Sequence, residues 1–248
     1  MAVVLETHGL TKSFGGILAV ADVNVSIASG EIVGIVGSNG AGKTTFVNLV
    51  TGYLKPDRGR IHYLGRDITA HPPREVTGLG IARSFQIPQI YTSLTVLENV
   101  LIALSAREGE SLRPWAPLFT RDREVEALSL LEPFALTEHA ARPVTELPEG
   151  GLKLLDIALS TALGPKLLLL DEPTSGVSSR DKFDVMERLL TIMREREVTV
   201  IFVEHDMDVV TRYAQRVLAF VYGEILADGP PEKVLADPGV RKAVLGWE

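Results

Sequence analysis

The apolar and polar positions of the first third of the chain alternate in the manner of β-strands. The alternation is clear over residues 2–7 and 17–27, an apolar run follows at 31–36, and residues 60–64 repeat the alternation. A period of two places every second side chain on one face of a sheet, so these runs predict strands. We expect a small antiparallel β layer around the apolar strand 31–36.

The spacing of apolar residues becomes helical between about residues 93 and 163. After a looser stretch at 107–119 that contains two prolines, helical spacing returns at 124–131 and 152–163. One helix face would carry Val96, Leu97, Val100, Leu101 and Leu104. These patterns predict a helical subdomain.

The final third alternates short apolar strands with a helix, which is typical of a parallel sheet. The predicted strands are 166–170 and 199–203, with an amphipathic helix around 183–193 and a solvated helix end at 194–197. Ile81–Phe85 is another strand-like piece.

Together these patterns predict an α/β fold in a single domain, residues 1–248. Residues 1–92 and 164–248 would form a core with a mostly parallel sheet and an antiparallel β layer. Residues 93–163 would form the helical subdomain. A chain of 248 residues buries enough surface to hold such a core without disulfides.

Composition narrows the classes of function. The formal charge of −7 argues against general nucleic-acid binding, so we expect no nucleic-acid partner. The absence of cysteine excludes disulfides, thiolate metal sites and cysteine nucleophiles. No apolar run reaches the roughly 18 residues that a membrane span requires, and residues 1–10 lack a signal-peptide pattern. A cytosolic chain is the expectation.

The segment Gly37–Thr45 has the spacing G-x-x-x-x-G-K-[ST] between a predicted strand and a predicted helix. Glycines at this spacing let backbone N–H groups surround phosphates, and the helix N-terminus adds partial positive charge. Lys43 would reach the β- and γ-phosphates, and the Thr44 hydroxyl would ligate Mg²⁺. A tight strand–helix turn alone would not need the Lys-Thr ending. The predicted nucleotide-binding residues of this loop are Ser38, Asn39, Gly40, Ala41, Gly42, Lys43, Thr44 and Thr45.

Two acids, Asp171 and Glu172, follow the apolar run Leu167–Leu170. A buried parallel strand tolerates carboxylates at its C-terminal edge, where ligands bind in open α/β sheets. Asp171 then suits the surroundings of Mg²⁺, and Glu172 the polarisation of an attacking water. An acidic turn that opens a helix at Pro173 is the structural alternative.

Three single residues give weaker signals. His205 follows strand 199–203 and would lie at the same sheet edge as Asp171, within reach of a γ-phosphate. Gln86 follows the strand-like piece 81–85, where its amide would reach Mg²⁺ or the water. Phe14 precedes the second predicted strand and would stack on adenine, with an ordinary core aromatic as the alternative.

In this order, these residues resemble the ATPase subunits of ATP-binding cassette (ABC) transporters over nearly the whole chain. The resemblance implies ATP and Mg²⁺ as cofactors, Phe14 as the adenine-stacking aromatic and Gln86 as the sensing glutamine. It also implies Asp171 on the Mg²⁺ side, Glu172 as the catalytic glutamate and His205 as the switch histidine. A second ATPase subunit would bind head to tail, with residues 175–179 in the loop that faces it.

Several segments are similar to the ATPase of importers for branched-chain (hydrophobic) amino acids. These segments are residues 82–86, 203–207 and 229–238. The resemblance implies transmembrane permease subunits, an extracytoplasmic solute-binding protein and a peripheral position on the cytoplasmic face of the inner membrane. Urea or amide importers and some lipid exporters share much of this pattern and remain alternatives.

The chain departs from the family at its signature sequence, normally Leu-Ser-Gly-Gly-Gln. The matching residues, which would meet the nucleotide of the partner subunit, are Leu147, Pro148, Glu149, Gly150 and Gly151. The serine is absent, Pro148 has no N–H, and Glu149 places a negative charge where an anion should dock. At about 4 Å such a contact costs on the order of 4 kcal/mol at an effective dielectric constant near 20.

Three interpretations of that departure stay open. In the first, the signature still works through Gly150 and the helix N-terminus. In the second, the chain pairs with a different subunit that has an intact signature. In the third, the chain is a nucleotide-gated subunit with weak turnover of ATP. Ser178–Arg180 also departs from the usual dimer-facing loop, with Asp181 as a shifted substitute for an acid. A soluble ATPase of DNA repair or translation is disfavoured, since the chain has no long coiled-coil insertion or second cassette.

A partner surface is expected around residues 86–97. Ile87, Pro88, Ile90 and Tyr91 are apolar residues in a predicted connecting loop, and exposed apolar patches mark partner sites. The alternative is that these side chains pack inward against the helical subdomain.

Overall fold

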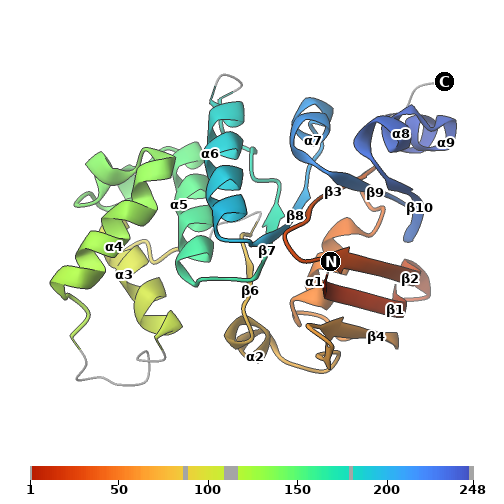
Figure 1. Ribbon diagram of the computed structural model, residues 1–248, viewed down its shortest axis with the longest axis horizontal. Helices are drawn as coiled ribbons and strands as arrows, with labels where there is room; N and C mark the ends of the chain where they lie inside the picture. Colours follow the sequence, from red (N-terminus) through yellow and green to blue (C-terminus); the bar gives the residue numbers. More distant parts are fainter. Residues whose placement is uncertain (1, 86–88, 109–116, 179–180, 246–248) are drawn as a thin grey trace.

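A six-stranded sheet in the order β10-β9-β3-β8-β7-β6 forms the centre of the protein (Figure 1). The computed structural model describes residues 2–85, 89–108, 117–178 and 181–245. The strands of this sheet are β3 (Ile32–Gly37), β6 (Ile81–Arg83), β7 (Leu167–Asp171), β8 (Thr199–Val203), β9 (Arg216–Val221) and β10 (Glu224–Gly229). Neighbouring strands are parallel except for β10, which runs antiparallel to β9. The predicted mostly parallel sheet is confirmed.

The apolar strands divide their side chains between two cores. In β8, Val200 and Phe202 belong to one core, while Ile201 and Val203 belong to the other. All five β8 residues are buried, which explains the unbroken apolar run in the sequence. Each face of the sheet is therefore covered by other elements.

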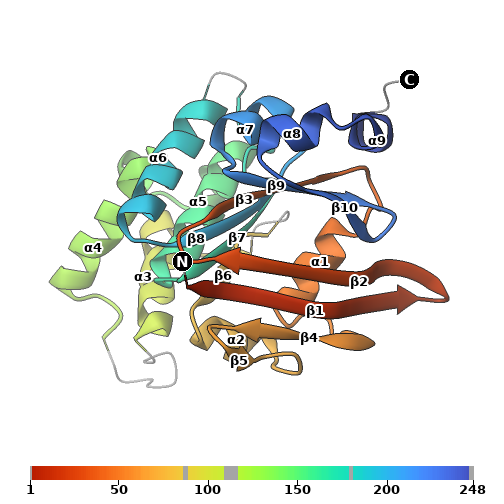
Figure 2. The same cartoon turned by 45° about the vertical axis from the view of Figure 1, so that its right-hand side comes forward.

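A four-stranded antiparallel sheet, β2-β1-β4-β5, covers one side together with helix α1. Its strands are β1 (Val3–Phe14), β2 (Ile17–Ala28), β4 (Arg58–Tyr63) and β5 (Arg66–Asp67). Helix α1 (Lys43–Val50) lies between the two sheets (Figure 2). Phe46 of α1 packs on Phe220 of β9, with ring centroids 5.4 Å apart.

The first strand is longer than the predicted 2–7. It continues to Phe14, which pairs with Ile17 across a turn of Gly15 and Gly16, both with positive φ. Gly9, also at positive φ, interrupts the alternation of apolar and polar residues inside β1. A search for a period of two therefore detects only the first half of the strand. Phe14 therefore precedes the second strand, as predicted, and is also the last residue of the first.

Helices cover the other face of the six-stranded sheet. The longer ones are α3 (Val96–Arg107), α4 (Arg121–Leu131), α5 (Glu149–Ala162) and α6 (Lys182–Glu195). The shorter ones are α7 (Met207–Tyr213), α8 (Pro231–Ala236) and α9 (Pro238–Val240). Helix α2 (Pro73–Gly78) instead packs through Val76 into the core on the side of the antiparallel sheet and α1. Short 3₁₀ turns lie at Glu132–Phe134, Thr137–His139 and Val144–Glu146, and a π-helical turn at Arg241–Leu245.

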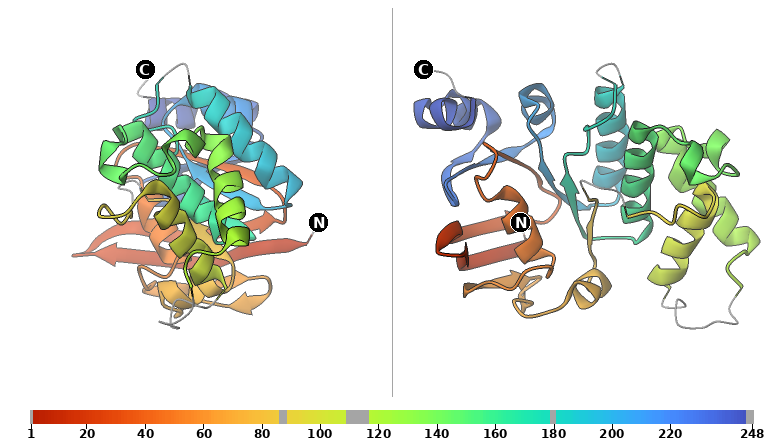
Figure 3. Two further views of the ribbon diagram at one scale, coloured as in Figure 1. Left: turned by 90° about the vertical axis from the view of Figure 1, so that its left-hand side faces the viewer. Right: turned by 180° about the vertical axis from the view of Figure 1, so that it is seen from behind.

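Helices α3 and α4 lie at the opposite end of the molecule from the antiparallel sheet (Figure 3). Helix α3 begins with a capping box between Thr95 and Glu98, which fixes its start close to the predicted residue 93. The division of the chain at residues 92/93 and 163/164 stays a prediction. Within the described ranges, no helix combines the length and apolar character needed to cross a bilayer.

Several elements are absent from the sequence-based prediction. They include α2, α7, and the pair β9 and β10. Strand β9 sits inside the sheet beside β3, yet its flanking residues Gln215 and Tyr222 give no clear boundary signal. Pro173 does not begin a helix, because residues 173–176 form a turn and α6 starts at Lys182.

Candidate functional site

A cavity of about 440 Å³ lies where β3, β7 and β8 end. These strands are mutually parallel in the order β3-β8-β7, so their C-terminal ends meet at one edge of the sheet. The residues lining the cavity are Ala19, Asn39, Gly40, Ala41, Gly42, Lys43, Thr44, Thr45, Glu172 and His205. The fold thus brings most of the phosphate loop together with two predicted residues from distant parts of the sequence.

Two glycines of the loop have no room for a side chain. A Cβ atom on Gly42 would come within 2.1 Å of the Ala19 carbonyl oxygen, and one on Gly37 within 2.5 Å of the Phe220 carbonyl oxygen. Gly42 also has φ of 103° and forms the N-cap of α1. The first residues of α1, Lys43 to Thr45, line the cavity, and the first N–H groups of any helix have no partner within the helix, which suits an anion site.

Lys43 is 6% exposed, and its ammonium group folds back onto the loop. Its Nζ donates to the carbonyl oxygens of Gly37 at 2.7 Å and Ser38 at 3.0 Å. Burial lowers the pKa of Lys43, whereas the nearby charges of Glu172 and Asp171 oppose that shift. The loop thus holds a cation at the cavity.

Asp171 is the last residue of β7 and is buried. Its Oδ2 accepts a hydrogen bond from Arg83 Nη2 at 2.9 Å, and the same guanidinium donates to Asn48 Oδ1. Arg83 and Asn48 are partners that sequence reasoning missed. They tie Asp171 to β6 and to the helix that follows the phosphate loop.

Glu172 and His205 face each other at the cavity. The distance from Glu172 Oε1 to His205 Nε2 is 3.2 Å, and both side chains are partly exposed. The Glu172 backbone has φ of +50°, a left-handed conformation that is uncommon for a residue with a side chain. Its N–H donates to the carbonyl oxygen of Val203 at 3.0 Å, which joins the ends of β7 and β8. The expectation that His205 and the acids share one sheet edge is confirmed.

Phe14, Ser38 and the buried Asp171 lie outside the cavity lining. The Phe14 side chain is 48% exposed, with Lys12 Nζ 5.7 Å from its ring centroid, so the alternative of an ordinary core aromatic is wrong. Gln86 falls outside the described residues.

The cavity offers oxygen ligands of the kind that Mg²⁺ prefers, the hydroxyl of Thr44 and the carboxylate of Glu172. Asp171 is buried behind the lining, where its carboxylate is bonded to Arg83 and precedes Glu172 in the chain. Among the residues that the structure describes, no group of three or more His, Cys, Asp or Glu side chains could hold a metal by itself. This donor set suits an ion that is shared with phosphate oxygens and water.

The segment at the predicted signature leads into α5. Pro148 is the N-cap of that helix, Glu149 its first residue, and both are exposed, whereas Leu147 is buried. A Cβ atom on Gly150 would lie 2.6 Å from the Gly176 carbonyl oxygen. Gly150 is therefore required for the close approach of α5 to the loop after β7.

The loop after β7 is held at both ends. The Thr174 N–H and hydroxyl both donate to Glu204 Oε1, at 3.0 and 2.7 Å. Ser178 Oγ donates to Asp181 Oδ2 at 2.7 Å, and Asp181 is the N-cap of α6. Ser179 and Arg180 lie outside the described part of the chain.

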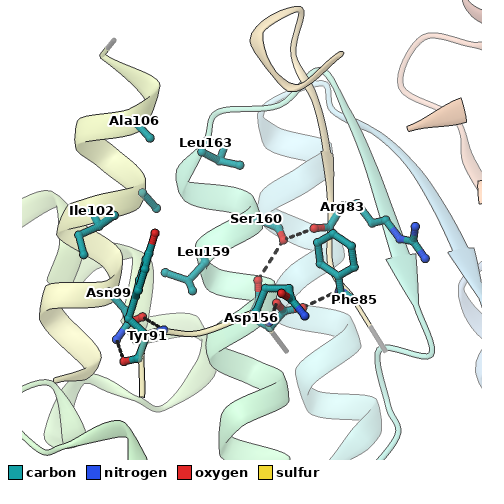
Figure 4. A pocket seen from close by; sticks show the side chains of 12 residues that line it. Arg83, Phe85, Tyr91, Asn99, Ile102, Ala106, Asp156, Leu159, Ser160 and Leu163 are labelled. Atoms are coloured by element: carbon teal, nitrogen blue, oxygen red, sulfur yellow. Dashed lines mark hydrogen bonds between the residues drawn. The ribbon is translucent and has the colours of Figure 1, made fainter. Parts of the chain in front are cut away.

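A second cavity, of about 190 Å³, lies between β6, α3 and α5 (Figure 4). Its lining includes Phe85, Tyr91 and Asn99, and Asn99 fixes the loop by accepting a hydrogen bond from the Tyr91 N–H at 2.9 Å. Tyr91 is 60% exposed, as predicted, but Ile90 is partly buried and packs on the core. The prediction that Ile90 adds exposed apolar surface is wrong, because the helices behind the loop take up its side chain. Ile87 and Pro88 are not among the described residues.

Helix α5 carries a buried polar face that sequence reasoning missed. Lys153, Asp156 and Ser160 lie at spacings of three and four residues and are all buried. Burial lowers the pKa of Lys153 and raises the pKa of Asp156 to about 6. The signal was present in the sequence, since three polar residues at helical spacing interrupt an otherwise apolar stretch.

Comparisons with known proteins agree with this site. The family model described as ABC transporter matches residues 20–175. The probable branched-chain amino acid transport ATP-binding protein LivG of Archaeoglobus fulgidus is 35% identical, over 98% of this chain and 95% of the relative. The high-affinity branched-chain amino acid transport ATP-binding protein BraF of Pseudomonas aeruginosa is 35% identical over 98% of both chains.

Solved structures give the same result. The ADP conformation of MJ1267, an ATP-binding cassette of an ABC transporter, superposes with a TM-score of 0.87 and 32% identity over 100% of both chains. A dimeric structure of MJ0796, an ATP-binding cassette bound to ADP and phosphate, gives a TM-score of 0.80 and 27% identity over 92% of this chain and 98% of that one.

The fold and the cavity define an ATP-binding cassette ATPase. The chain belongs to the ABC transporter family, and the resemblance seen in its sequence is confirmed. Membership implies that the chain binds ATP.

Proposed function

We propose that this chain hydrolyses ATP with Mg²⁺ at the cavity of the phosphate loop, and that hydrolysis energises uptake of branched-chain or other hydrophobic amino acids. The observation that carries the proposal is the joint lining of one cavity by the phosphate loop and by the Glu172–His205 pair. The names of the relatives support the class of solute.

Binding would rest on the loop and on α1. The N–H groups of residues 38–45 surround the phosphates, and Lys43 turns from the carbonyl oxygens of the loop toward the β- and γ-phosphates. The exposed ring of Phe14 stacks on adenine. Thr44, Asp171 and Gln86 would hold Mg²⁺, which when bound neutralises charge on the phosphate oxygens.

Hydrolysis would rest on Glu172 and His205. Glu172 accepts a hydrogen bond from a water that attacks the γ-phosphorus, and the bond from that phosphorus to the bridging oxygen breaks, leaving ADP and phosphate. His205, 3.2 Å from Glu172, contacts the γ-phosphate and orients the carboxylate. The experiment that tests the proposal is phosphate release by the purified chain, which should require Mg²⁺ and stop when the metal is chelated.

Partners follow from the same proposal. A second ATPase subunit, identical or different, would meet this chain head to tail, with residues 147–151 facing its nucleotide. The dimeric structure of MJ0796 supports the presence of a second subunit. Permease subunits would anchor the pair at the cytoplasmic face of the inner membrane, and an extracytoplasmic binding protein would deliver the solute.

Replacing Glu149 and Pro148 together should strengthen dimerisation. In a head-to-tail dimer the exposed Glu149 would oppose the partner's γ-phosphate, with a repulsion on the order of 4 kcal/mol. Relief of even a third of that value changes a dimerisation constant about tenfold. Pro148→Ser with Glu149→Gly should therefore raise ATP-dependent dimerisation about tenfold and increase turnover, as measured by analytical ultracentrifugation and phosphate release.

The matched control is Glu146→Gln, which removes the charge of an exposed acid just ahead of the segment. That variant should dimerise like the unmodified chain. If the double variant also leaves the dimerisation constant unchanged, the altered signature is functionally neutral.

The second cavity would receive a helix of the permease subunit. Tyr91, which is exposed, lines it together with Phe85 and Asn99. Tyr91→Ala should therefore weaken assembly with the membrane subunits by roughly tenfold, the typical effect of losing an aromatic anchor, while ATP affinity of the isolated chain stays unchanged.

Pull-down from detergent extracts, with nucleotide titration of the same proteins, makes this measurement. Tyr222→Ala, which removes an exposed tyrosine at the β9–β10 turn, is the control. Unfolding of Tyr91→Ala, or loss of ATP affinity without an assembly defect, would instead give Tyr91 a structural role.

A further inference from the structure

Lys153 joins α5 to two points of the candidate site. Its side chain is buried, and its Nζ donates to the carbonyl oxygen of Phe85 at 2.7 Å and to that of Asp171 at 2.6 Å. One ammonium group thus connects α5 with the last residue of β7 and with Phe85, two residues after the end of β6.

The Asp171 carbonyl has a special position in the chain, because it belongs to the peptide unit that enters Glu172. A peptide unit is planar, so a hydrogen bond to its carbonyl oxygen fixes the direction in which the next residue starts. Lys153 therefore restrains the backbone directly ahead of Glu172.

Lys153 shares its helix face with Asp156 and Ser160, whose bonds to the backbone near Arg83 and Phe85 can be followed in Figure 4. Asp156 accepts hydrogen bonds from the N–H groups of Phe85 at 2.8 Å and Gln89 at 3.3 Å, and Ser160 Oγ donates to the Arg83 carbonyl oxygen at 2.8 Å. All of these bonds reach backbone atoms, so they do not depend on the side chains of Arg83, Phe85 and Gln89. Helix α5 is thereby joined to the backbone on both sides of residues 86–88.

The backbone of Glu172 needs such support. A residue with a side chain is strained at φ of +50° and keeps that conformation only when its surroundings fix it. On one side the Glu172 N–H is bonded to Val203 of β8, and on the other Lys153 holds the Asp171 carbonyl. Of these two hydrogen bonds, the one from Lys153 comes from α5, the helix that begins with residues 149–151.

We propose that Lys153 is a positioning residue for hydrolysis, which sets the orientation of Glu172 and makes that orientation depend on the placement of α5. The inference rests on the proposed function, since it requires Glu172 to act on the attacking water. A shift of α5, whether caused by a partner at its N-terminus or at the second cavity, would then reach Glu172 through a single side chain.

The test compares Lys153→Met and Lys153→Arg in the full-length chain. Methionine keeps the length of the side chain but donates no hydrogen bond, so kcat should fall roughly tenfold to a hundredfold through misplacement of Glu172. ATP affinity, measured by titration calorimetry, should stay within about twofold, because the phosphate loop is untouched. Arginine, which keeps donors at the same site, should recover part of the lost kcat.

Two further variants make the result specific. Thr161→Val changes a buried residue of α5 whose hydroxyl bonds within its own helix, and it should leave kcat unchanged. In a chain that already carries Glu172→Gln, Lys153→Met should lower the residual single-turnover rate by less than about threefold, because the two residues act as a unit. If Lys153→Met fails to fold, Lys153→Gln, which keeps an uncharged donor, takes its place.

The outcomes separate this inference from the proposed function. The inference is overturned if Lys153→Met folds and keeps a normal kcat, or if it loses kcat and ATP affinity in equal measure. In either case the proposed function stands as long as Glu172→Gln is inactive. If the unmodified chain does not hydrolyse ATP, or if Glu172→Gln keeps its turnover, the proposed function itself fails.

Discussion

The Lys43→Ala chain is expected to lose most of its affinity for ATP. Lys43 is the buried cation of the phosphate loop, and its present hydrogen bonds go to carbonyl oxygens of that same loop. A hydrogen bond to a charged group is worth roughly 1.5–3 kcal/mol, which corresponds to about a tenfold to a hundredfold loss of affinity. Titration calorimetry of the purified chain with MgATP measures this effect.

Lys166→Ala is the matched control for that prediction. Lys166 is an exposed lysine at the start of β7, at the opposite end of the strand from the cavity, so its loss should leave ATP affinity unchanged. Equal affinities for Lys43→Ala and the unmodified chain would place the nucleotide away from the phosphate loop.

The Glu172→Gln chain is expected to bind ATP normally and to hydrolyse it hardly at all. Glutamine keeps the size of the side chain but is a much weaker base, and a general base contributes about 10²- to 10⁴-fold to a rate. A fall in phosphate release of roughly a hundredfold or more is therefore predicted, with ATP affinity within about twofold of normal. The 3.2 Å contact with His205 can persist as a hydrogen bond to the amide.

The control here is Glu187→Gln on α6, an exposed acid 3.9 Å from Arg212 and outside the cavity lining. It should hydrolyse ATP at the normal rate. Near-normal turnover of Glu172→Gln would remove Glu172 from the role of base and point to another group at the cavity.

The sequence predicted those parts of the site that are contiguous in the chain. The phosphate loop was recognised because its glycines, Lys43 and Thr44 stand at fixed spacing, and the structure gives a reason for two of the glycines in the close approach of Ala19 and Phe220. Asp171 and Glu172 were recognised because an apolar strand ends in two acids. In both cases a local pattern is enough, because the residues that form the feature are neighbours in the sequence.

Contacts between distant residues were not predicted. Arg83 reaches Asp171 across 88 positions, and Lys153 reaches Phe85 across 68. Such pairs depend on the order of strands in the sheet, which the alternation of polar and apolar residues does not specify. For the same reason the sequence left open whether Ile90 is exposed or packs inward, because its partial burial depends on which elements pack behind the loop.

The central claim is that ATP hydrolysis by this chain energises uptake of branched-chain amino acids. The most direct measurement is ATP hydrolysis in proteoliposomes that contain the chain with its permease subunits and its solute-binding protein, with solute added on the side of the binding protein. We expect leucine, isoleucine or valine to stimulate phosphate release and to accumulate across the bilayer. With the Glu172→Gln chain, neither the stimulated phosphate release nor the accumulation should occur. Stimulation by urea alone, or uptake of leucine that continues with Glu172→Gln, would contradict it.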